Sequence, residues 1–261
     1  MTKATILISI IVFGLISCGP KTEADKNESL LSPAELFVQS IENEHNSEVY
    51  NSKEIIQFDL NLVFGGKIRF DGSIQMTPNA GMVNMKDSNK TMIWDGQNAY
   101  TSDSSYSKAR FDLLTWSYFF AAPYKLNDKG TIHTILGQKL LNEESFDALK
   151  LTFEDGIGDS PEDWYVVYKD QKSDLLAAMA YIVTSSKSLE EAEKDPHAIT
   201  YEAYVELDGI PFATQWNFWT WNEEGELNKL LGSAVISNIR FIKKEESLFK
   251  PSSDLTLISN N

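Results

Sequence analysis

Hydrophobic and polar residues alternate along most of the chain, with the period of two that is typical of half-buried β-strands. Residues 55–64, IIQFDLNLVF, show this pattern clearly, and a Gly65-Gly66 turn separates them from a second alternating segment, residues 67–76. Two such segments joined by a tight turn predict a β-hairpin. The inward-facing positions expected for the second strand are Ile68, Phe70, Ile74 and Met76.

Further strand-like segments follow at short intervals, and turn signals such as Asp95-Gly96, Gly137 and Asp208-Gly209 separate many of them. Many short strands with brief connections indicate an antiparallel sheet. The additional predicted strands are 82–85, 91–94, 99–102, 131–136, 148–153, 164–169, 176–183, 199–207, 212–221 and 231–242.

Two segments change to helical spacing. Ser32-Pro33 supplies an N-cap and a first-turn proline, and the helix that it opens should end near His45-Asn46. Residues 109–124, dense in aromatic side chains, predict a second helix that ends before Pro123. The expected fold is therefore mainly β with α, a single domain over residues 32–261. We expect a large curved antiparallel sheet, an open half-barrel with both helices on its concave face.

The first seventeen residues predict a signal peptide. The apolar run 4–16 is shorter than the ~20 residues that a membrane-spanning helix needs. Leu15-Ile16-Ser17-Cys18 resembles the lipobox of bacterial lipoproteins, which implies cleavage before Cys18 and lipid on its thiol. An ordinary secretory signal with an incidental cysteine is the alternative.

Residues 18–31 are polar and charged, so we expect a lipidated flexible tether. By the same resemblance Gly19 favours the outer membrane, with the periplasmic and surface faces both open. Cys18 is the only cysteine, which excludes an internal disulfide and a cysteine-based metal site. The net charge of −15 argues against nucleic-acid binding, because that requires a basic surface. No cofactor is implied.

Several segments, in order, resemble an uncharacterised lipoprotein family of Bacteroidota whose members are similar to the LolA/LolB lipoprotein carriers. After the lipobox these are WDGQNAY, the aromatic helix, LNDKGTIHTILGQKLL, ALKLTFEDGIGDSPEDWYVVY and YVELDGIPFATQWNFW. The resemblance spans roughly residues 32–250. It implies an open half-barrel, closed by helices, with an apolar cavity that accepts acyl chains.

The aromatic helix and the strand at 212–221 supply candidate binding residues. The helix could be a lid over an apolar cavity, or its side chains could simply fill the concave face as core, which is the usual role of aromatic clusters. The candidate lining residues are Phe111, Trp116, Phe119, Phe120, Trp216 and Phe218. Trp219 and Trp221 are candidate exposed aromatics for stacking sugars, unless another element covers that face.

The acidic loop 154–163 offers Asp155, Asp159 and Asp163 as calcium ligands, although its spacing does not match an EF-hand and a solvated turn explains the composition. The three histidines lack a paired metal-binding spacing, and no nucleophile motif is visible. The sequence therefore favours a non-catalytic, membrane-anchored envelope lipoprotein that binds a lipid or acyl chain. A surface adhesion or glycan-binding lipoprotein is one alternative, and an envelope enzyme of unrecognised chemistry is another; protein partners stay open.

Overall fold

The computed structural model describes residues 31–258. The predicted signal peptide, the lipidation site Cys18 and nearly all of the predicted tether lie outside these residues. Within 31–258, none of the helices is both long and apolar enough to cross a membrane.

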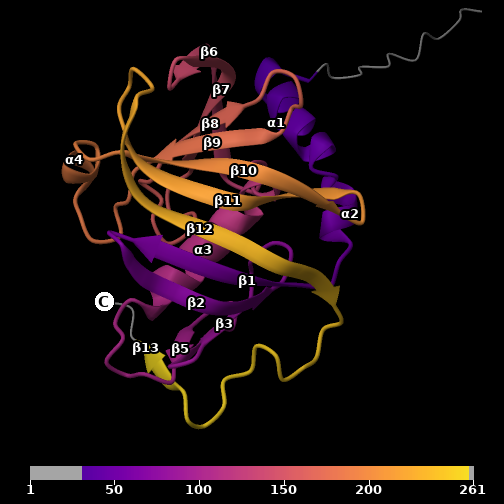
Figure 1. The fold of residues 1–261 in the computed structure, drawn as a ribbon, viewed down its shortest axis with the longest axis vertical. Helices are drawn as coiled ribbons and strands as arrows, with labels where there is room; N and C mark the ends of the chain where they lie inside the picture. The colour runs from indigo at the N-terminus through magenta and orange to yellow at the C-terminus, as the bar shows by residue number, and fades with distance from the viewer. Residues whose placement is uncertain (1–30, 259–261) are drawn as a thin grey trace, which may run out of the picture. The chain divides into compact units, whose positions relative to one another are not determined.

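The described residues form one antiparallel sheet of 13 strands in the order β13-β5-β4-β3-β2-β1-β12-β11-β10-β9-β8-β7-β6 (Figure 1). The strands are β1 (Ile55–Phe64), β2 (Lys67–Met76), β3 (Val83–Asp87), β4 (Thr91–Trp94), β5 (Ala99–Thr101), β6 (Thr131–Leu141), β7 (Glu144–Phe153), β8 (Tyr165–Lys169), β9 (Leu176–Tyr181), β10 (His197–Leu207), β11 (Ile210–Trp221), β12 (Leu227–Ile242) and β13 (Thr256–Ile258).

The sheet consists of two meanders that meet at one seam. Strands β1 to β5 form the first meander and β6 to β12 the second, and β12 pairs with β1 so that Leu62 lies opposite Ala234. The short β13 then pairs with β5, which leaves β6 and β13 at the two edges. Because the edges do not pair, the sheet is an open half-barrel, and the predicted fold class is confirmed.

Within the described part of the chain, four α-helices and one 3-10 turn accompany the sheet: α1 (Pro33–Glu44), α2 (Ser47–Asn51), α3 (Ala109–Ala121), η1 (Ala122–Tyr124) and α4 (Leu189–Ala192). The Ser32 hydroxyl accepts from the Glu35 amide and the Glu35 carboxylate accepts from the Ser32 amide, a capping box that begins α1. Helix α3 connects the two meanders and crosses behind the sheet (Figure 1). Its apolar residues surround the helix on several sides, as expected for a buried helix.

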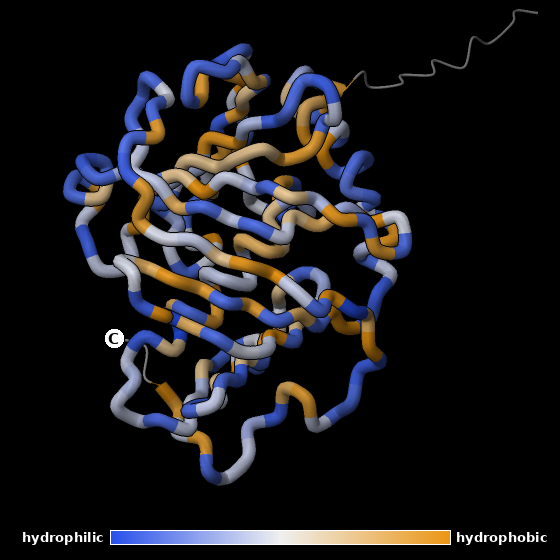
Figure 2. The backbone as a smooth tube through the Cα atoms, viewed as in Figure 1, coloured by the Kyte–Doolittle hydropathy of each residue, from blue (hydrophilic) through white to orange (hydrophobic). Residues whose placement is uncertain are grey.

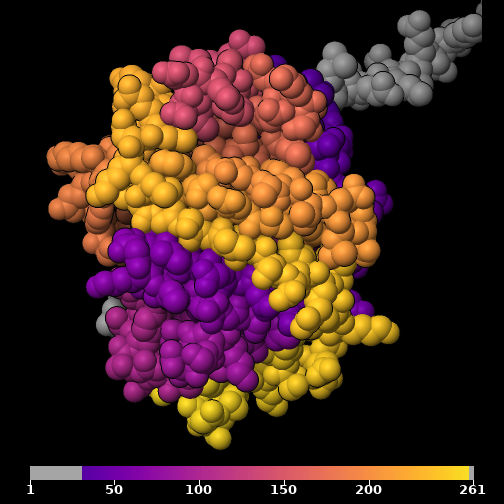
Figure 3. Space-filling view, viewed as in Figure 1, coloured from indigo at the N-terminus to yellow at the C-terminus, as the bar shows by residue number. Residues whose placement is uncertain are grey.

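The main core fills the space between the sheet and α3. Of the alternating residues of β1 that the sequence pattern places inward, Ile56, Phe58, Leu60 and Leu62 are fully buried and Phe64 is half-buried. Hydrophobic and hydrophilic residues alternate along several strands, as expected for a sheet with one buried and one solvated face (Figure 2). The side chains of β10, β11, β12 and β1 form a continuous band on the outer face (Figure 3).

A smaller cluster lies on the other face of β7 to β11 and includes Tyr168, Ala180 and Trp221. Two hairpin tips meet beside this cluster. The amide of Asn142, in the turn between β6 and β7, donates to the carbonyl of Gly225, in the turn between β11 and β12, at 2.8 Å. A Cβ on Gly225 would lie 1.9 Å from the Leu140 carbonyl oxygen, so this contact requires glycine.

Two local predictions are wrong, and both involve β-bulges. Ile68 is 68% exposed and not inward-facing, because Leu62 pairs with Phe70 and Val63 with Ile68, which leaves Arg69 as an extra residue. Gly137 does not end its strand. It follows a register shift inside β6, which continues to Leu141.

Candidate functional site

Helix α3 directs three aromatic side chains towards the sheet. Trp116, Phe119 and Phe120 are spaced by three and four residues, so they share one side of the helix. Phe120 stacks on Phe58 of β1 with a centroid distance of 3.9 Å and an interplanar angle of 7°. The helix is thereby packed directly against the strand at the seam.

Strand β11 supplies the opposing aromatic residues. Trp116 lies edge-on to Phe218 at 5.9 Å, and Phe120 contacts Trp216 at 6.4 Å. Five of the six predicted lining residues are at most 6% exposed, and Phe111 is half-buried at the start of α3. The six side chains belong to the same interior.

A cavity in this interior has a volume of about 20 Å³. Such a volume accommodates about one water molecule, whereas ligand pockets occupy ~300–1,000 Å³. Of the predicted lining residues only Phe120 and Trp216 reach this cavity. In the described conformation the aromatic side chains themselves occupy the space of the half-barrel. The residues around the cavity are His45, Phe120, Pro123, Tyr124, Tyr201, Tyr204, Pro211, Phe212, Ala213 and Trp216.

The polar groups at the cavity are electrically neutral. Burial lowers the pKa of His45 to about 3 and raises those of Tyr124, Tyr201 and Tyr204 above their ordinary value. The Nε2 atom of His45 accepts the Leu176 amide at 3.1 Å. Its Nδ1 and the Tyr124 hydroxyl have no hydrogen-bond partner among residues 31–258. The cavity is thus uncharged at neutral pH.

Tyrosines also connect the C-terminal end of α3 to neighbouring elements. The Tyr201 hydroxyl on β10 donates to the Phe119 carbonyl at 3.0 Å. Tyr124 stacks on Tyr50 of α2 with 3.4 Å between ring centroids. The end of α3 is therefore held by aromatic packing and by one buried hydrogen bond.

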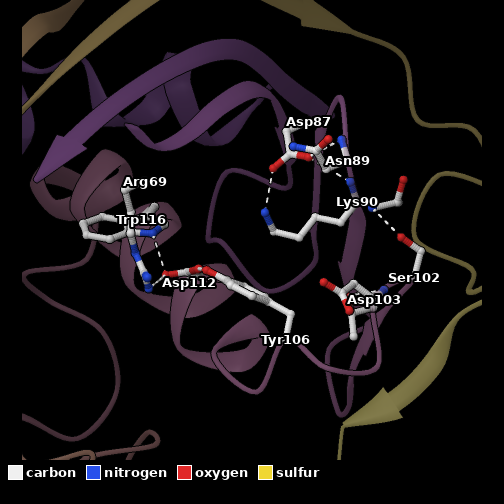
Figure 4. A network of polar contacts seen from close by, with 11 residues as sticks. Arg69, Asp87, Asn89, Lys90, Ser102, Asp103, Tyr106, Asp112 and Trp116 are labelled. Carbon is white, nitrogen blue, oxygen red and sulfur yellow. Dashed lines mark hydrogen bonds and ion pairs between the residues drawn. The ribbon is translucent and has the colours of Figure 1, made fainter. Parts of the chain in front are cut away.

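The N-terminal half of α3 is held differently, by a buried carboxylate. Asp112 is 3% exposed, and its Oδ1 accepts from Arg69 Nη2 at 2.8 Å and from Trp116 Nε1 at 3.1 Å (Figure 4). The Tyr106 hydroxyl donates to Oδ2. Burial, followed by the hydrogen bond to Asp112, raises the pKa of Tyr106, which therefore remains a donor.

The bulge in β2 makes this network possible. In regular alternation Arg69 would point to the outer face together with Asp71, but the extra residue turns its side chain towards α3. The ammonium of Lys90 lies 4.6 Å above the Tyr106 ring and pairs with Asp87 at 2.7 Å. Charged side chains thus extend from Arg69, Tyr106 and Asp112, which together form a clasp on α3, to the end of β3 and its turn into β4.

A second ion pair attaches α3 to the acidic loop. Arg110 donates from Nε to Asp159 at 2.6 Å, and its guanidinium lies 4.7 Å from the Trp94 ring. Asp163 accepts from the backbone and hydroxyl of Thr184 instead, and Asp155 is exposed. The three calcium candidates therefore have different surroundings: Asp159 pairs with Arg110, Asp163 bonds to Thr184, and Asp155 is exposed. Residues 31–258 contain no group of carboxylates, histidines or cysteines suited to a metal ion.

The two tryptophans considered for sugar stacking do not form an exposed pair. Trp221 is 8% exposed, packs edge-on to Trp164 and donates to the Tyr168 hydroxyl at 3.2 Å. Trp219 is half-buried and donates to Thr200 Oγ1 at 3.4 Å. The expectation of exposure is wrong for Trp221, because the smaller cluster on the outer face covers it.

Sequence reasoning missed the clasp residues Arg69, Tyr106 and Asp112, and the cavity residue His45. The available signals were an aspartate inside an otherwise apolar helix and an arginine inside an alternating strand. A buried carboxylate requires compensating donors, so these signals together could have suggested an ion pair.

Comparisons with known proteins agree with this architecture. A model of the DUF6503 family, described as a family of unknown function, matches residues 66–220. No curated protein matches the chain. A LolA superfamily protein from Nitrosomonas europaea is similar in structure, with a TM-score of 0.54 and 11% identity over 82% of this chain and 97% of that chain. A DUF1329 family protein from Desulfovibrio piger has a TM-score of 0.49 and 11% identity, over 84% and 98% of the two chains. The first likeness shows that the chain has the LolA fold.

Proposed function

We propose that this chain, which belongs to the DUF6503 family of unknown function, is a lipid-anchored envelope protein that binds an apolar ligand such as an acyl chain. The ligand would lie between the sheet and α3. The observation that carries the proposal is the aromatic interior of the half-barrel, where Trp116 of α3 faces Phe218 of β11 and Phe120 faces Trp216. The LolA fold and the resemblance to lipoprotein carriers support the same function.

The electrostatics of the interior favour an uncharged ligand. His45 and the tyrosines around the cavity stay neutral, because burial shifts each pKa away from neutral pH. An acyl chain entering there would meet ring faces and neutral polar groups, with no charge to desolvate. These groups are suited to binding, and we propose no reaction for them.

Helix α3 must move for a chain to enter, because the cavity of about 20 Å³ is too small. Buried methylenes contribute ~0.8 kcal/mol each, which offsets the lost contact of Phe120 with Phe58. Opening would also separate Asp112 from Arg69, since these residues lie on α3 and β2. The described state is the closed form of a gated site.

Binding is tested with the mature chain carrying Cys18→Ser, which removes the lipid. After purification under delipidating conditions and refolding, native mass spectrometry should show a 1:1 adduct with added palmitate or phosphatidylethanolamine. Protein that stays ligand-free at saturating concentrations of both lipids would contradict the binding site.

The anchor is tested separately in the bacterium. Mass spectrometry of the N-terminal peptide should find a diacylglyceryl group on Cys18, and Cys18→Ser should move the protein from the membrane fraction to the soluble fraction. An unmodified Cys18 in membrane-bound protein would contradict the anchor and leave the binding site untouched. The glycan-binding alternative lacks its stacking platform, because Trp221 is buried.

A further inference from the structure

A second apolar site lies at the edge of the sheet, outside the interior described above. A groove of about 340 Å³ separates α1 from the concave side of β6, β7 and β8. Its hydrophobic walls include Leu36 and Phe37 of α1 and Ile135 of β6. Leu36 is 53% exposed and Ile135 is 39% exposed, so both present apolar surface to solvent. The full lining is Pro33, Leu36, Phe37, Ser40, Ile135, Gly137, Asp147, Ala148 and Lys169.

The cationic residue of the groove, Lys169, is already neutralised by the protein. Lys169 donates to the Ser40 hydroxyl at 2.8 Å, pairs with Asp174, and places its ammonium 5.4 Å from the Phe37 ring. These contacts also fix α1 against β8, because Ser40 and Phe37 belong to the helix. The walls are therefore held in place, while among residues 31–258 Leu36 and Ile135 remain exposed to solvent.

The bulge in β6 lies in the wall of the groove. Gly137 has a φ of +70°, and a Cβ added there would meet no atom within 4 Å. Strand β6 itself, residues 131–141, contains no acidic residue, and its partner β7 contributes Asp147 to the lining of the groove. With Asp147 as the one carboxylate beside the Lys169 ammonium in its lining, the groove suits a surface of zwitterionic phospholipids better than a strongly anionic one.

The groove lies where the described chain begins. Its wall starts at Pro33, two residues after Leu31, and Cys18 precedes Leu31 by thirteen residues. Thirteen residues span at most about 43–47 Å. A lipid on Cys18 would thus keep this edge of the molecule close to the membrane surface.

We propose that the groove between α1 and β6 binds one acyl chain of a membrane phospholipid and holds this edge of the domain against the bilayer. The inference rests on the proposed anchor for its geometry. An acyl chain fits this groove because the walls are apolar and Asp174 neutralises Lys169. The membrane is its source because only thirteen residues separate Cys18 from Leu31, beside the groove. The groove is a membrane-contact site, and the interior under α3 is a separate site.

The test uses the cysteine-free mature chain (Cys18→Ser) carrying an N-terminal polyhistidine tag, bound to vesicles of phosphatidylcholine, phosphatidylethanolamine and a nickel-chelating lipid. This attachment makes the result independent of lipidation at Cys18. Single cysteines replace Leu36, Ile135 or Val235 and carry an environment-sensitive fluorophore. Val235 is the matched control, since it is also 53% exposed but lies on the outer face of β12.

Lipids brominated in their acyl chains should quench the labels at positions 36 and 135 and leave the label at 235 unquenched. Equal quenching at all three positions, or none at 36 and 135, would overturn the proposal. A signal at 36 that depends on protein concentration without vesicles would assign the groove to a second copy and overturn it as well. So would a signal restricted to the chain with its native lipid, because that chain's own acyl group would then be the occupant.

A complementary measurement omits the tag and follows co-flotation of the Cys18→Ser chain with vesicles. Leu36→Asp should weaken binding roughly tenfold or more, because a buried leucine side chain is lost from the contact. Val235→Asp should bind as the parent chain does. Equal binding by both variants would overturn the proposal.

Discussion

Asp112 is the residue on which the position of α3 depends most. A buried carboxylate is tolerated only with compensating donors, and Arg69, Trp116 and Tyr106 provide them. Arg69 alone supplies a positive charge, and it reaches the carboxylate only because of the bulge in β2. The two residues are 43 positions apart, so no local pattern links them.

Replacing Arg69 with methionine leaves the charge of Asp112 without a cationic partner. We expect Arg69→Met to lower the free energy of unfolding by about 2 kcal/mol, less than for a fully buried pair because Arg69 retains 25% exposure. Urea unfolding measures the change. Lys67→Met, an exposed position in the same strand, is the control and should stay within about 0.5 kcal/mol of the parent. Equal losses in both variants would contradict a specific role for the ion pair.

At the scale of elements, alternation in the sequence was sufficient to predict most strands and both long helices. The 3-residue β13 and the 5-residue α2 were missed, because such short segments carry no periodicity of their own. The bulges at Arg69 and before Gly137 were missed because pairing partners, and not local sequence, determine register. The six candidate lining residues could be predicted from the sequence, because aromatic residues are frequent within two short segments. The clasp and His45 depend on contacts between distant segments.

Helix α3 is the element whose movement the proposed function requires, and Phe120 occupies the space that a ligand would take. Phe120→Leu removes the stack on Phe58 and should lower the free energy of unfolding by about 1–3 kcal/mol. The same change should increase affinity for an acyl chain, because the ligand then displaces fewer contacts. Urea unfolding and native mass spectrometry measure the two effects.

Phe111→Leu is the matched control, since Phe111 lies on the same helix but is half-buried at its start. It should change stability and affinity less than Phe120→Leu does. If Phe120→Leu instead weakened binding, the ring would be a required ligand contact, and displacement of Phe120 would be the wrong description of opening.

At the scale of the whole molecule, the seam between β1 and β12 makes the two meanders one cooperative unit. Ile236 is 2% exposed on β12 and pairs with Leu60. Ile236→Ala should cost about 2–4 kcal/mol and lower protection from hydrogen exchange in β2–β3 and in β8–β9 by the same amount. Val235→Ala, the exposed neighbour, should have little effect. Loss of protection confined to one meander would show that the two halves unfold independently.

The contact between the two hairpin tips has a further consequence for the long edge strand. Within residues 31–258, the eleven-residue strand β6 pairs with β7 on one side only. Its other edge could serve as a template that joins further chains into an extended sheet. Here the Asn142–Gly225 hydrogen bond covers one end of that edge, and the bulge before Gly137 interrupts its register. A second chain therefore cannot add along the full length of β6. The half-barrel can stay open along its side and still resist growth into aggregates.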